Sequence, residues 1–179
     1  MRTRLDLAII GAGFAGLHML YRAVGSQRKV RLFEAGSSVG GTWHWNRYPG
    51  ARVDIESMAY CYAFSAALQQ DWDWTERYSP QPELLRYANH VADRFDLRRD
   101  IQLETRVASA TFDEASARWT VLTEAGERFD GQYLIMATGC LSIPQPPAFK
   151  GLETFKGDWY HSANWPREGV DFAGKRVGL

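Results

Sequence analysis

The sequence predicts an α/β domain in which a parallel sheet carries a helical insertion and an antiparallel β-meander. Two observations lead to this prediction. An apolar run passes through a glycine-rich turn into a helical pattern and then into a second apolar run, as in a βαβ unit. Later in the chain, short runs of alternating polarity are typical of antiparallel strands. The 179 residues have room for one domain, or for one domain and part of another.

The first predicted unit is a strand, a turn, a helix and a second strand. Residues 5–10 form a short apolar run that ends at a glycine, as a buried parallel strand does. Residues 14–24 have helical spacing, and Gly25 is placed to end this helix. Residues 29–33 form the second strand, which closes at Glu34. The unit has the size expected of a βαβ unit.

The middle of the chain combines a long loop with the clearest helix. Residues 35–60 are rich in glycine and aromatic residues and have few periodic signals, so we expect a structured loop of a length that is usually functional. Residues 79–97 predict a helix with Pro82 in its first turn and Glu83 beside it. Its apolar stripe indicates packing rather than chemistry. The stripe consists of Leu84, Leu85, Ala88, Val91, Ala92 and Phe95.

The last predicted strands form a meander and its continuation. Residues 101–129 read as an antiparallel meander with turns near residues 113–117 and 124–126. Residues 132–137 read as a further buried strand. Beyond it, three prolines indicate a linker, and residues 174–179 look like a turn that enters a new strand.

Composition excludes several classes of protein. Hydrophobic residues at 45% and charged residues at 23% fit a folded domain. The 21 basic residues balance the 21 acidic ones, so no charge pattern indicates binding to nucleic acid or to an anionic membrane. The uncharged stretch of residues 7–21 is too short to span a membrane. Cys61 and Cys140 cannot form a disulfide framework, so we expect a reducing, cytoplasmic compartment, and the histidines show no metal-ligand spacing.

The turn after the first strand has the pattern G-x-G-x-x-G, formed by Gly11, Gly13 and Gly16 with Phe14 and Ala15 between them. In this pattern the first glycine permits a tight turn, the second lets the backbone approach a pyrophosphate, and the third lets helix and strand pack closely. The following helix adds free N–H groups and a partial positive charge. We interpret residues 11–16, the glycine turn, as a dinucleotide-binding site, with an ordinary turn as the alternative.

Glu34 supports this interpretation. It closes the second strand 18 residues after Gly16, where such sites bind ribose hydroxyls. Its carboxylate would repel a 2′-phosphate, so the site is expected to bind FAD or NAD rather than NADP.

Later segments resemble the flavoproteins that have two dinucleotide-binding domains, which favours FAD. They are the Gly-Gly-Thr-Trp turn at residues 40–43, the meander, and the Ala-Thr-Gly segment at residues 137–139. The chain lacks the Cys-x-x-Cys pair that the disulfide-reductase branch of this group needs.

A second resemblance is more specific. Residues 155–166, the monooxygenase motif, are similar to the F-x-G-x-x-x-H-x-x-x-W-P pattern of type I Baeyer–Villiger monooxygenases. The matching positions are Phe155, Gly157, His161, Trp165 and Pro166. Residues 40–57 match this family as well, and the resemblance runs from residue 5 to residue 179. Further matching positions are Trp74, Glu76, Arg77 and Tyr78.

The resemblance implies an enzyme that uses FAD, NADPH and dioxygen to convert a small ketone into an ester or a lactone through a flavin peroxide. Such a site must exclude water, because a leaking site releases hydrogen peroxide. A flavin monooxygenase that oxidises nitrogen or sulfur is the alternative within this chemistry. The loop around Asp54 and the Pro166 that follows Trp165 favour ketone oxidation.

The family's residue roles pass to the matching positions. The resemblance implies that the glycine turn holds the FAD pyrophosphate and that Glu34 binds the adenosine ribose. Val107 would contact the adenine through its backbone. The full set of cofactor-binding positions that it implies is Gly11, Gly13, Phe14, Ala15, Gly16, Glu34, Gly41, Thr42, Trp43, Trp45, Arg52, Val53, Asp54, Tyr60, Val107, Thr138 and Gly139.

Asp54 is the one position to which the resemblance gives a catalytic role. It matches an aspartate near flavin and nicotinamide, where its charge would orient a catalytic arginine. Arg52 and Val53 lie where the family's loop approaches NADP. His161 matches a histidine at the hinge between two nucleotide domains, so its implied role is conformational.

The same resemblance implies how the chain is divided. Residues 1–140 would form the FAD-binding part, and residues 141–179 the linker, the monooxygenase motif and the start of an NADP-binding domain. The family's second glycine-rich pattern and its catalytic arginine are absent, so we expect an N-terminal portion of an incomplete two-domain flavoprotein, without turnover by itself. A non-catalytic FAD-binding fragment is the alternative reading.

Several of these positions also have a purely structural interpretation. Trp43 and Trp45 could be core aromatics. Asp54 could be a solvated loop carboxylate, and His161 a hydrogen-bonded structural histidine.

Overall fold

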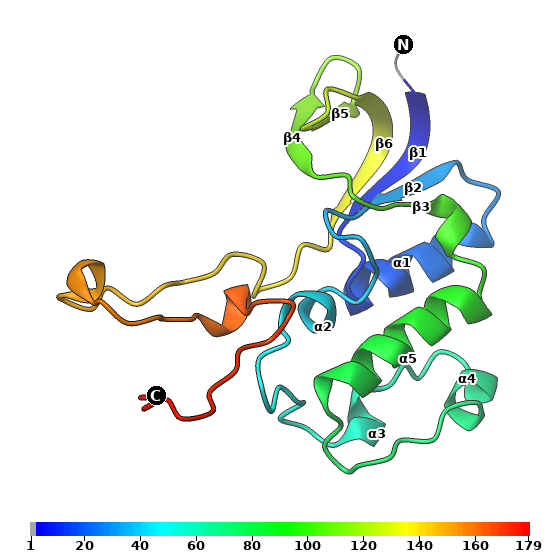
Figure 1. The fold of residues 1–179 in the computed structure, drawn as a ribbon. Helices are drawn as coiled ribbons and strands as arrows, with labels where there is room; N and C mark the ends of the chain where they lie inside the picture. Colours follow the sequence, from blue (N-terminus) through cyan, green and yellow to red (C-terminus); the bar gives the residue numbers. More distant parts are fainter. Residues whose placement is uncertain (1–2) are drawn as a thin grey trace.

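Six runs of β-forming residues assemble into one mixed sheet in the computed structural model, which describes residues 3–179 (Figure 1). The strand order is β3-β2-β1-β6-β5-β4. Parallel pairing joins β3, β2, β1 and β6, whereas antiparallel pairing joins β6, β5 and β4. The strands are β1 (Thr3–Ile10), β2 (Val30–Phe33), β3 (Ile101–Gln102), β4 (Val107–Asp113), β5 (Arg118–Thr123) and β6 (Arg128–Met136).

The two longest helices among the described residues pack against each other beside the parallel half of the sheet (Figure 1). The helices are α1 (Phe14–Val24), α2 (Thr42–Trp45), α3 (Ser57–Tyr60), α4 (Ala66–Gln70), α5 (Gln81–Arg94) and the 3₁₀ helices η1 (Arg98–Asp100), η2 (Leu152–Thr154) and η3 (Ser162–Asn164). Helix α1 crosses from β1 to β2, and the main core forms where α1, α5 and these strands meet. Ile9, Leu17, Leu20, Leu32 and Ala88 are completely buried there.

The βαβ unit that the sequence predicts is confirmed, and helix α1 has the predicted bounds. The long helix is shorter than the predicted 79–97. Pro80 is extended, with ψ 160°, and therefore precedes the helix. At the other end Asp96 adopts a left-handed φ of +50°, which α-helical geometry does not allow.

The meander differs from the prediction in two ways. Residues 101–102 join β2 in parallel and lie outside the meander. The predicted end of the meander and the predicted strand at 132–137 are one continuous strand, β6. Asp130 and Gly131 resemble a turn in sequence, but here Arg118 pairs with Asp130, and Gly131 lies against Ala8 of β1.

The end of β6 is also less buried than the sequence predicts. Tyr133 is 53% exposed and Met136 is 61% exposed. Neither side chain belongs to an apolar cluster among residues 3–179, so the described residues do not cover this part of the strand.

Residues 137–179 leave the sheet as an extended arm (Figure 1). Within the described residues the arm contains η2 and η3 but no strand, so the strand expected after residue 174 is not formed. The amide of Lys175 instead closes a turn on the carbonyl of Phe172. Large apolar side chains of the arm are exposed, including Ile143 at 72% and Phe149 at 69%. No helix among residues 3–179 has the length and apolar character needed to cross a membrane.

The contact between β1 and α1 depends on Gly16. A Cβ atom at this position would lie 1.8 Å from the carbonyl oxygen of Gly11, which is a backbone atom and cannot rotate away. We therefore expect Gly16→Ala to lower the free energy of unfolding by about 3 kcal/mol or more, measured by urea denaturation of the chain.

Gly25→Ala is the matched control for this substitution. Gly25 has a φ of −75°, and nothing lies within 4 Å of a Cβ atom placed there. This variant should be as stable as the parent or more stable by up to about 1 kcal/mol. Equal stability of the Gly16→Ala variant and the parent would contradict the close backbone contact.

Glu83 gives the fold a pH dependence. Its side chain is buried, and its carboxylate accepts hydrogen bonds from the backbone N–H of Thr75 at 3.0 Å and from the Thr75 hydroxyl at 2.9 Å. Burial alone would raise the pKa of Glu83, but these bonds, a hydrogen bond from Ser79 and the charge of Arg86 outweigh burial and lower it.

A carboxylate with a lowered pKa in the folded state stabilises the fold above its unfolded pKa of about 4.5, and this contribution disappears as the pH falls through the folded pKa. We expect the parent to lose more stability than Glu83→Gln between about pH 6 and pH 3. Urea denaturation across this range checks the difference, and parallel pH profiles would contradict it.

Candidate dinucleotide-binding site

The glycine turn places a free helix N-terminus next to the end of β1. Gly13 is the N-cap residue of α1, and because it has no side chain it cannot cap the first N–H groups of the helix. Among residues 3–179 the backbone N–H groups of Phe14, Ala15 and Gly16 have no hydrogen-bond acceptor. Together with the helix dipole, these groups form a site for an anion such as a phosphate.

The glycine turn lies against the loop that contains Gly41. A Cβ atom built on Gly13 would meet the Cα atom of Gly41 at 3.5 Å, which is an ordinary van der Waals contact. Packing within the chain therefore does not require glycine at position 13. The reverse approach is tight, because a Cβ atom on Gly41 would lie 2.7 Å from the Cα atom of Gly13. We call the two glycine-containing loops and the first turn of α1 the cradle.

Glu34 joins the loops of this cradle. It is buried, and its carboxylate accepts a hydrogen bond from the N–H of Ala12 at 2.7 Å and another from the N–H of Gly36 at 2.7 Å. A carboxylate has about four acceptor positions, so these two bonds leave about two of them unused. Glu34 therefore lies where the sequence predicts, and it has a structural function that the sequence did not reveal.

Backbone hydrogen bonds link the segment before β4 to the segment after β2. The N–H of Glu104 donates to the carbonyl of Gly36 at 3.0 Å, and the N–H of Thr105 donates to the carbonyl of Glu34 at 2.8 Å. Val107, two residues after Thr105, begins β4 and pairs with Thr123.

An aromatic wall stands beside the glycine turn. The indole N–H of Trp43 donates a hydrogen bond of 2.7 Å to the hydroxyl oxygen of Tyr60, and the ring of Tyr60 meets the ring of Phe14 edge-on at 5.1 Å. Burial raises the pKa of Tyr60, and the nearby charge of Asp54 raises it as well, although the bond from Trp43 opposes this. Tyr60 therefore keeps its proton at neutral pH. Thr42 begins α2 next to this wall.

Trp45 does not join the wall. It lies two residues after Trp43 on α2, and side chains two apart on a helix do not face each other. Its ring is 39% exposed and meets the ring of His44 edge-on at 5.1 Å, near Gly36. The structure thus separates two tryptophans that the resemblance placed together among the cofactor-binding positions.

Two further side chains hold the wall in place, and the sequence analysis missed their roles. The hydroxyl of Tyr62 donates a hydrogen bond of 2.6 Å to the carbonyl of Phe14, and burial strongly raises the pKa of Tyr62. The side-chain amide of Gln81, at the start of α5, donates to the carbonyl of Trp43. The only feature of the sequence that could have indicated the role of Gln81 is its position directly before Pro82, in the first turn of the helix.

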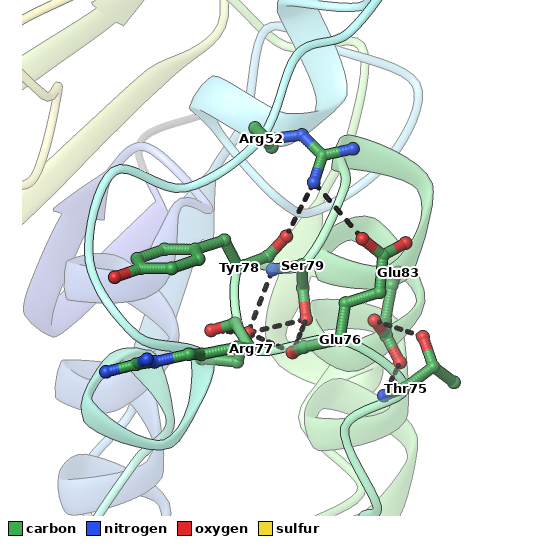
Figure 2. A network of polar contacts seen from close by, with 8 residues as sticks. Arg52, Thr75, Glu76, Arg77, Tyr78, Ser79 and Glu83 are labelled. Carbon is green, nitrogen blue, oxygen red and sulfur yellow. Dashed lines mark hydrogen bonds and ion pairs between the residues drawn. The ribbon is translucent and has the colours of Figure 1, made fainter.

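Asp54 lies on a loop that is fastened to a second loop, and Figure 2 shows Arg52 of the first loop reaching Glu76 and Tyr78 of the second. We call residues 52–57 the Asp54 segment and residues 75–79 the Glu76 segment. The guanidinium of Arg52 pairs with the carboxylate of Glu76 at 3.1 Å and donates to the carbonyl of Tyr78 at 3.2 Å. Val53 is buried, whereas Asp54 is exposed. The two segments that resemble the monooxygenase family in sequence therefore contact each other in the fold.

Thr138 and Gly139 lie behind the glycine turn. The carbonyl oxygen of Ala137 would lie 2.5 Å from a Cβ atom on Gly11, and the Cα atom of Thr138 is also close. The N–H of Ala137 donates to the carbonyl of Ile10 at 2.8 Å. The segment after β6 therefore supports the turn from behind.

The monooxygenase motif folds locally within the arm. A Cβ atom on Gly157 would lie 2.8 Å from the ring of Phe155. His161 caps η3, because its Nδ1 accepts a hydrogen bond of 3.2 Å from the N–H of Ala163. The ring of Trp165, which precedes Pro166, packs against Tyr160 with ring centroids 5.6 Å apart.

Two positive charges act on His44 of α2. Burial lowers the pKa of His44, and the positive charges of Arg47 and then of Arg167, the residue after the monooxygenase motif, lower it further.

Residues 3–179 contain no group of three or more His, Cys, Asp or Glu side chains that could hold a metal ion. The cradle itself combines a free helix N-terminus with the buried carboxylate of Glu34 and the aromatic wall.

Comparison with known proteins identifies the relatives of the chain. Residues 4–179 match the family described as flavin-binding monooxygenase-like. The acetone monooxygenase (methyl acetate-forming) of Gordonia sp. (strain TY-5) is 50% identical over 177 residues, which are 99% of this chain and 33% of that protein. A phenazine N-monooxygenase of Lysobacter antibioticus is 45% identical over 179 residues, covering 99% of this chain and 33% of that protein.

Solved structures agree with these matches. A steroid monooxygenase bound to NADP superimposes with a TM-score of 0.88 at 53% identity, and the match covers 96% of this chain and 33% of that one. The chain thus spans about a third of the length of the relatives it matches. Because the family match covers nearly all of its residues, the chain belongs to the flavin-binding monooxygenase-like family.

Proposed function

We propose that this chain is the FAD-binding part of a monooxygenase that uses NADPH and dioxygen to convert a small ketone into an ester or a lactone. The observation that supports it most is the cradle between Gly13 and Gly41, which leaves backbone N–H groups of α1 open to a pyrophosphate in a flavin-binding family. A relative that is named for forming methyl acetate from acetone supports ketone oxidation.

The residues of the cradle would hold FAD by its polar parts. The N–H groups of Phe14, Ala15 and Gly16 would bind the pyrophosphate, and the free acceptor positions of Glu34 would bind the adenosine ribose. FAD would supply the redox chemistry and the activation of dioxygen. This chain would supply binding and orientation.

The aromatic wall would shield the reacting centre. Trp43 and Tyr60 are fixed to each other by a hydrogen bond and to Phe14 by packing, so this apolar surface would help to exclude water from a flavin bound beside it. Tyr60 keeps its proton, and that proton has no acceptor among residues 3–179, so its hydroxyl would donate to the bound cofactor.

The Asp54 segment would face the second cofactor. Asp54 is exposed and its charge raises the pKa of Tyr60, so we propose that this negative charge also acts on the reacting groups and on a positively charged partner residue. We propose that Arg52 and Val53 lie along the path of NADPH, and that the glutamate partner of Arg52 keeps this guanidinium in place.

The remaining features extend the proposal to the whole protein. The exposed apolar side chains of residues 137–179 support the view that this arm, with His161 at its hinge, connects residues 1–140 to further protein. The isolated chain would bind FAD without turnover. Cys61 and Cys140 are both free thiols, which supports a reducing, cytoplasmic compartment.

Oxidation of nitrogen is a second candidate. The phenazine N-monooxygenase that is 45% identical to this chain favours it. A panel with acetone, cyclic ketones and phenazines, given with NADPH to the longest polypeptide that carries this sequence, separates the two. Ester or lactone formation supports ketone oxidation, whereas N-oxide formation without ester contradicts it. NADPH-dependent product from the isolated chain would contradict the absence of turnover.

Gly13→Ala tests the cradle directly. The added methyl group has room in the folded chain but occupies the space in front of the backbone that a pyrophosphate would need. We expect the dissociation constant for FAD to rise at least about tenfold, measured by quenching of flavin fluorescence, while the melting temperature stays within about 3 °C. Gly25→Ala is the control, and unchanged FAD affinity in Gly13→Ala would contradict the site.

Asp54→Ala tests the proposed electrostatic role. In the longest polypeptide that carries this sequence, we expect flavin reduction by NADPH to slow by about tenfold or more, with FAD content unchanged. Stability should change by less than about 0.5 kcal/mol, because the side chain is exposed. Asp73→Ala removes a similarly exposed carboxylate as the control. Stopped-flow absorbance gives the rate, and equal rates in variant and parent would remove Asp54 from the site.

A further inference from the structure

Asp54 has no anchor of its own. It is exposed, and among residues 3–179 its carboxylate makes neither a hydrogen bond nor an ion pair. The position of this carboxylate therefore depends on the backbone on either side of it.

That backbone is held by hydrogen bonds on both sides of Asp54. The N–H of Val53 donates to the carbonyl of Ser79 at 3.1 Å, and the N–H of Ser57 donates to the carbonyl of Arg77 at 2.8 Å. The Asp54 segment and the Glu76 segment thus run as a short antiparallel pair, which continues into the bridge between Arg52 and Pro80.

The hydroxyl of Ser57 is the buried centre of this pair. The residue is 1% exposed, and its oxygen accepts a hydrogen bond of 2.9 Å from the N–H of Ser79 and lies 2.7 Å from the Ser79 hydroxyl. It also lies 2.9 Å from the carbonyl of Glu76, to which it can donate. One side chain therefore satisfies polar groups along the Glu76 segment that burial would otherwise leave without partners.

Glu83 fastens the same segment to helix α5. Its buried carboxylate holds the N–H and the hydroxyl of Thr75, the first residue of the Glu76 segment (Figure 2). Glu83 lies in the first turn of α5, where the helix dipole favours a negative charge. Since α5 is packed into the core, this contact ties the loops to the rigid part of the fold.

The outer ion pairs contribute less to this arrangement. Arg52 pairs with Glu76, and Arg77 pairs with Glu56, but all four side chains are about half exposed or more. Solvent and salt screen such pairs, so the buried groups carry most of the restraint.

We infer that Ser57 and Glu83 are positioning residues that set the place of the Asp54 carboxylate by fastening the Asp54 segment to the Glu76 segment and to α5. They act through the backbone and do not contact the glycine turn. This inference rests on the proposed function, because it takes Asp54 to act on the bound cofactors.

Amide hydrogen exchange on the 179-residue chain tests the restraint itself. We expect Ser57→Ala to raise the exchange rates of the amides of Val53, Ser57 and Ser79 at least about tenfold, with β1 and α1 unchanged. If Ser57→Ala unfolds the chain, Thr75→Val replaces it as the test, because Thr75 is at an exposed position. We expect Thr75→Val to raise the same exchange rates to a smaller extent. Ser109→Ala, an exposed serine on β4, is the control. Unchanged exchange at these amides in both variants would overturn the inference.

A double-mutant cycle in the longest polypeptide that carries this sequence tests the action on Asp54. We expect Ser57→Ala and Glu83→Leu each to slow flavin reduction by NADPH at least about fivefold with FAD content unchanged, and Glu83→Gln to stay within about twofold of the parent. In the Asp54→Ala background Ser57→Ala should add no further loss. If the rate losses of the two single variants multiply in the double variant, the positioning role is overturned. A normal rate for Asp54→Ala alone would instead sink the proposed function and leave the exchange result intact.

Discussion

The carboxylate of Glu34 holds together the two loops on which the site depends. It is buried at the end of β2 and accepts hydrogen bonds from Ala12 in the glycine turn and from Gly36 in the following loop. A buried charge is tolerated only when it is well hydrogen-bonded, and these two N–H groups provide that. The same residue would bind a ribose, so the cofactor would complete a hydrogen-bond network that the chain has already started.

Aromatic packing then gives the cradle its second side. A chain of rings runs from Trp43 on α2 and Tyr60 through Phe14 on α1 and Tyr62 to Tyr87 on α5, each ring within about 6 Å of a neighbour. Two hydroxyl groups in this cluster form hydrogen bonds with the backbone. The hydroxyl of Tyr62 donates to the carbonyl of Phe14, and the hydroxyl oxygen of Tyr87 accepts from the N–H of Tyr62. Tyr60 is different, because its oxygen accepts from Trp43 and its proton is left for another partner.

The parts of the fold that depend on local sequence could be predicted. The glycine turn follows from the positive φ of Gly11 and the close backbone contact at Gly16, and α1 follows from one helical period, so the bounds of α1 agree with the structure. The continuity of β6 could not be predicted, because Asp130 and Gly131 have the local character of a turn. Their strand conformation depends on Arg118 and on Ala8, which are distant in sequence.

The candidate site shows the same division. Glu34 and Trp43 were predicted from motifs, but the contacts of Ser57 with Ser79 and of Glu83 with Thr75 have no sequence signature, since each pairs residues that only the folded loops bring together. Trp45 was placed with Trp43 because the motif names both, and helical geometry separates them.

Chemical-shift mapping of the backbone amides during titration with FAD would show whether the cofactor binds at the glycine turn. We expect the amides of Gly13, Phe14, Ala15 and Gly16 and of the loop after Glu34 to shift together, with one saturation curve. Shifts confined to other surfaces, or none at FAD concentrations that saturate a relative, would contradict FAD binding at this turn.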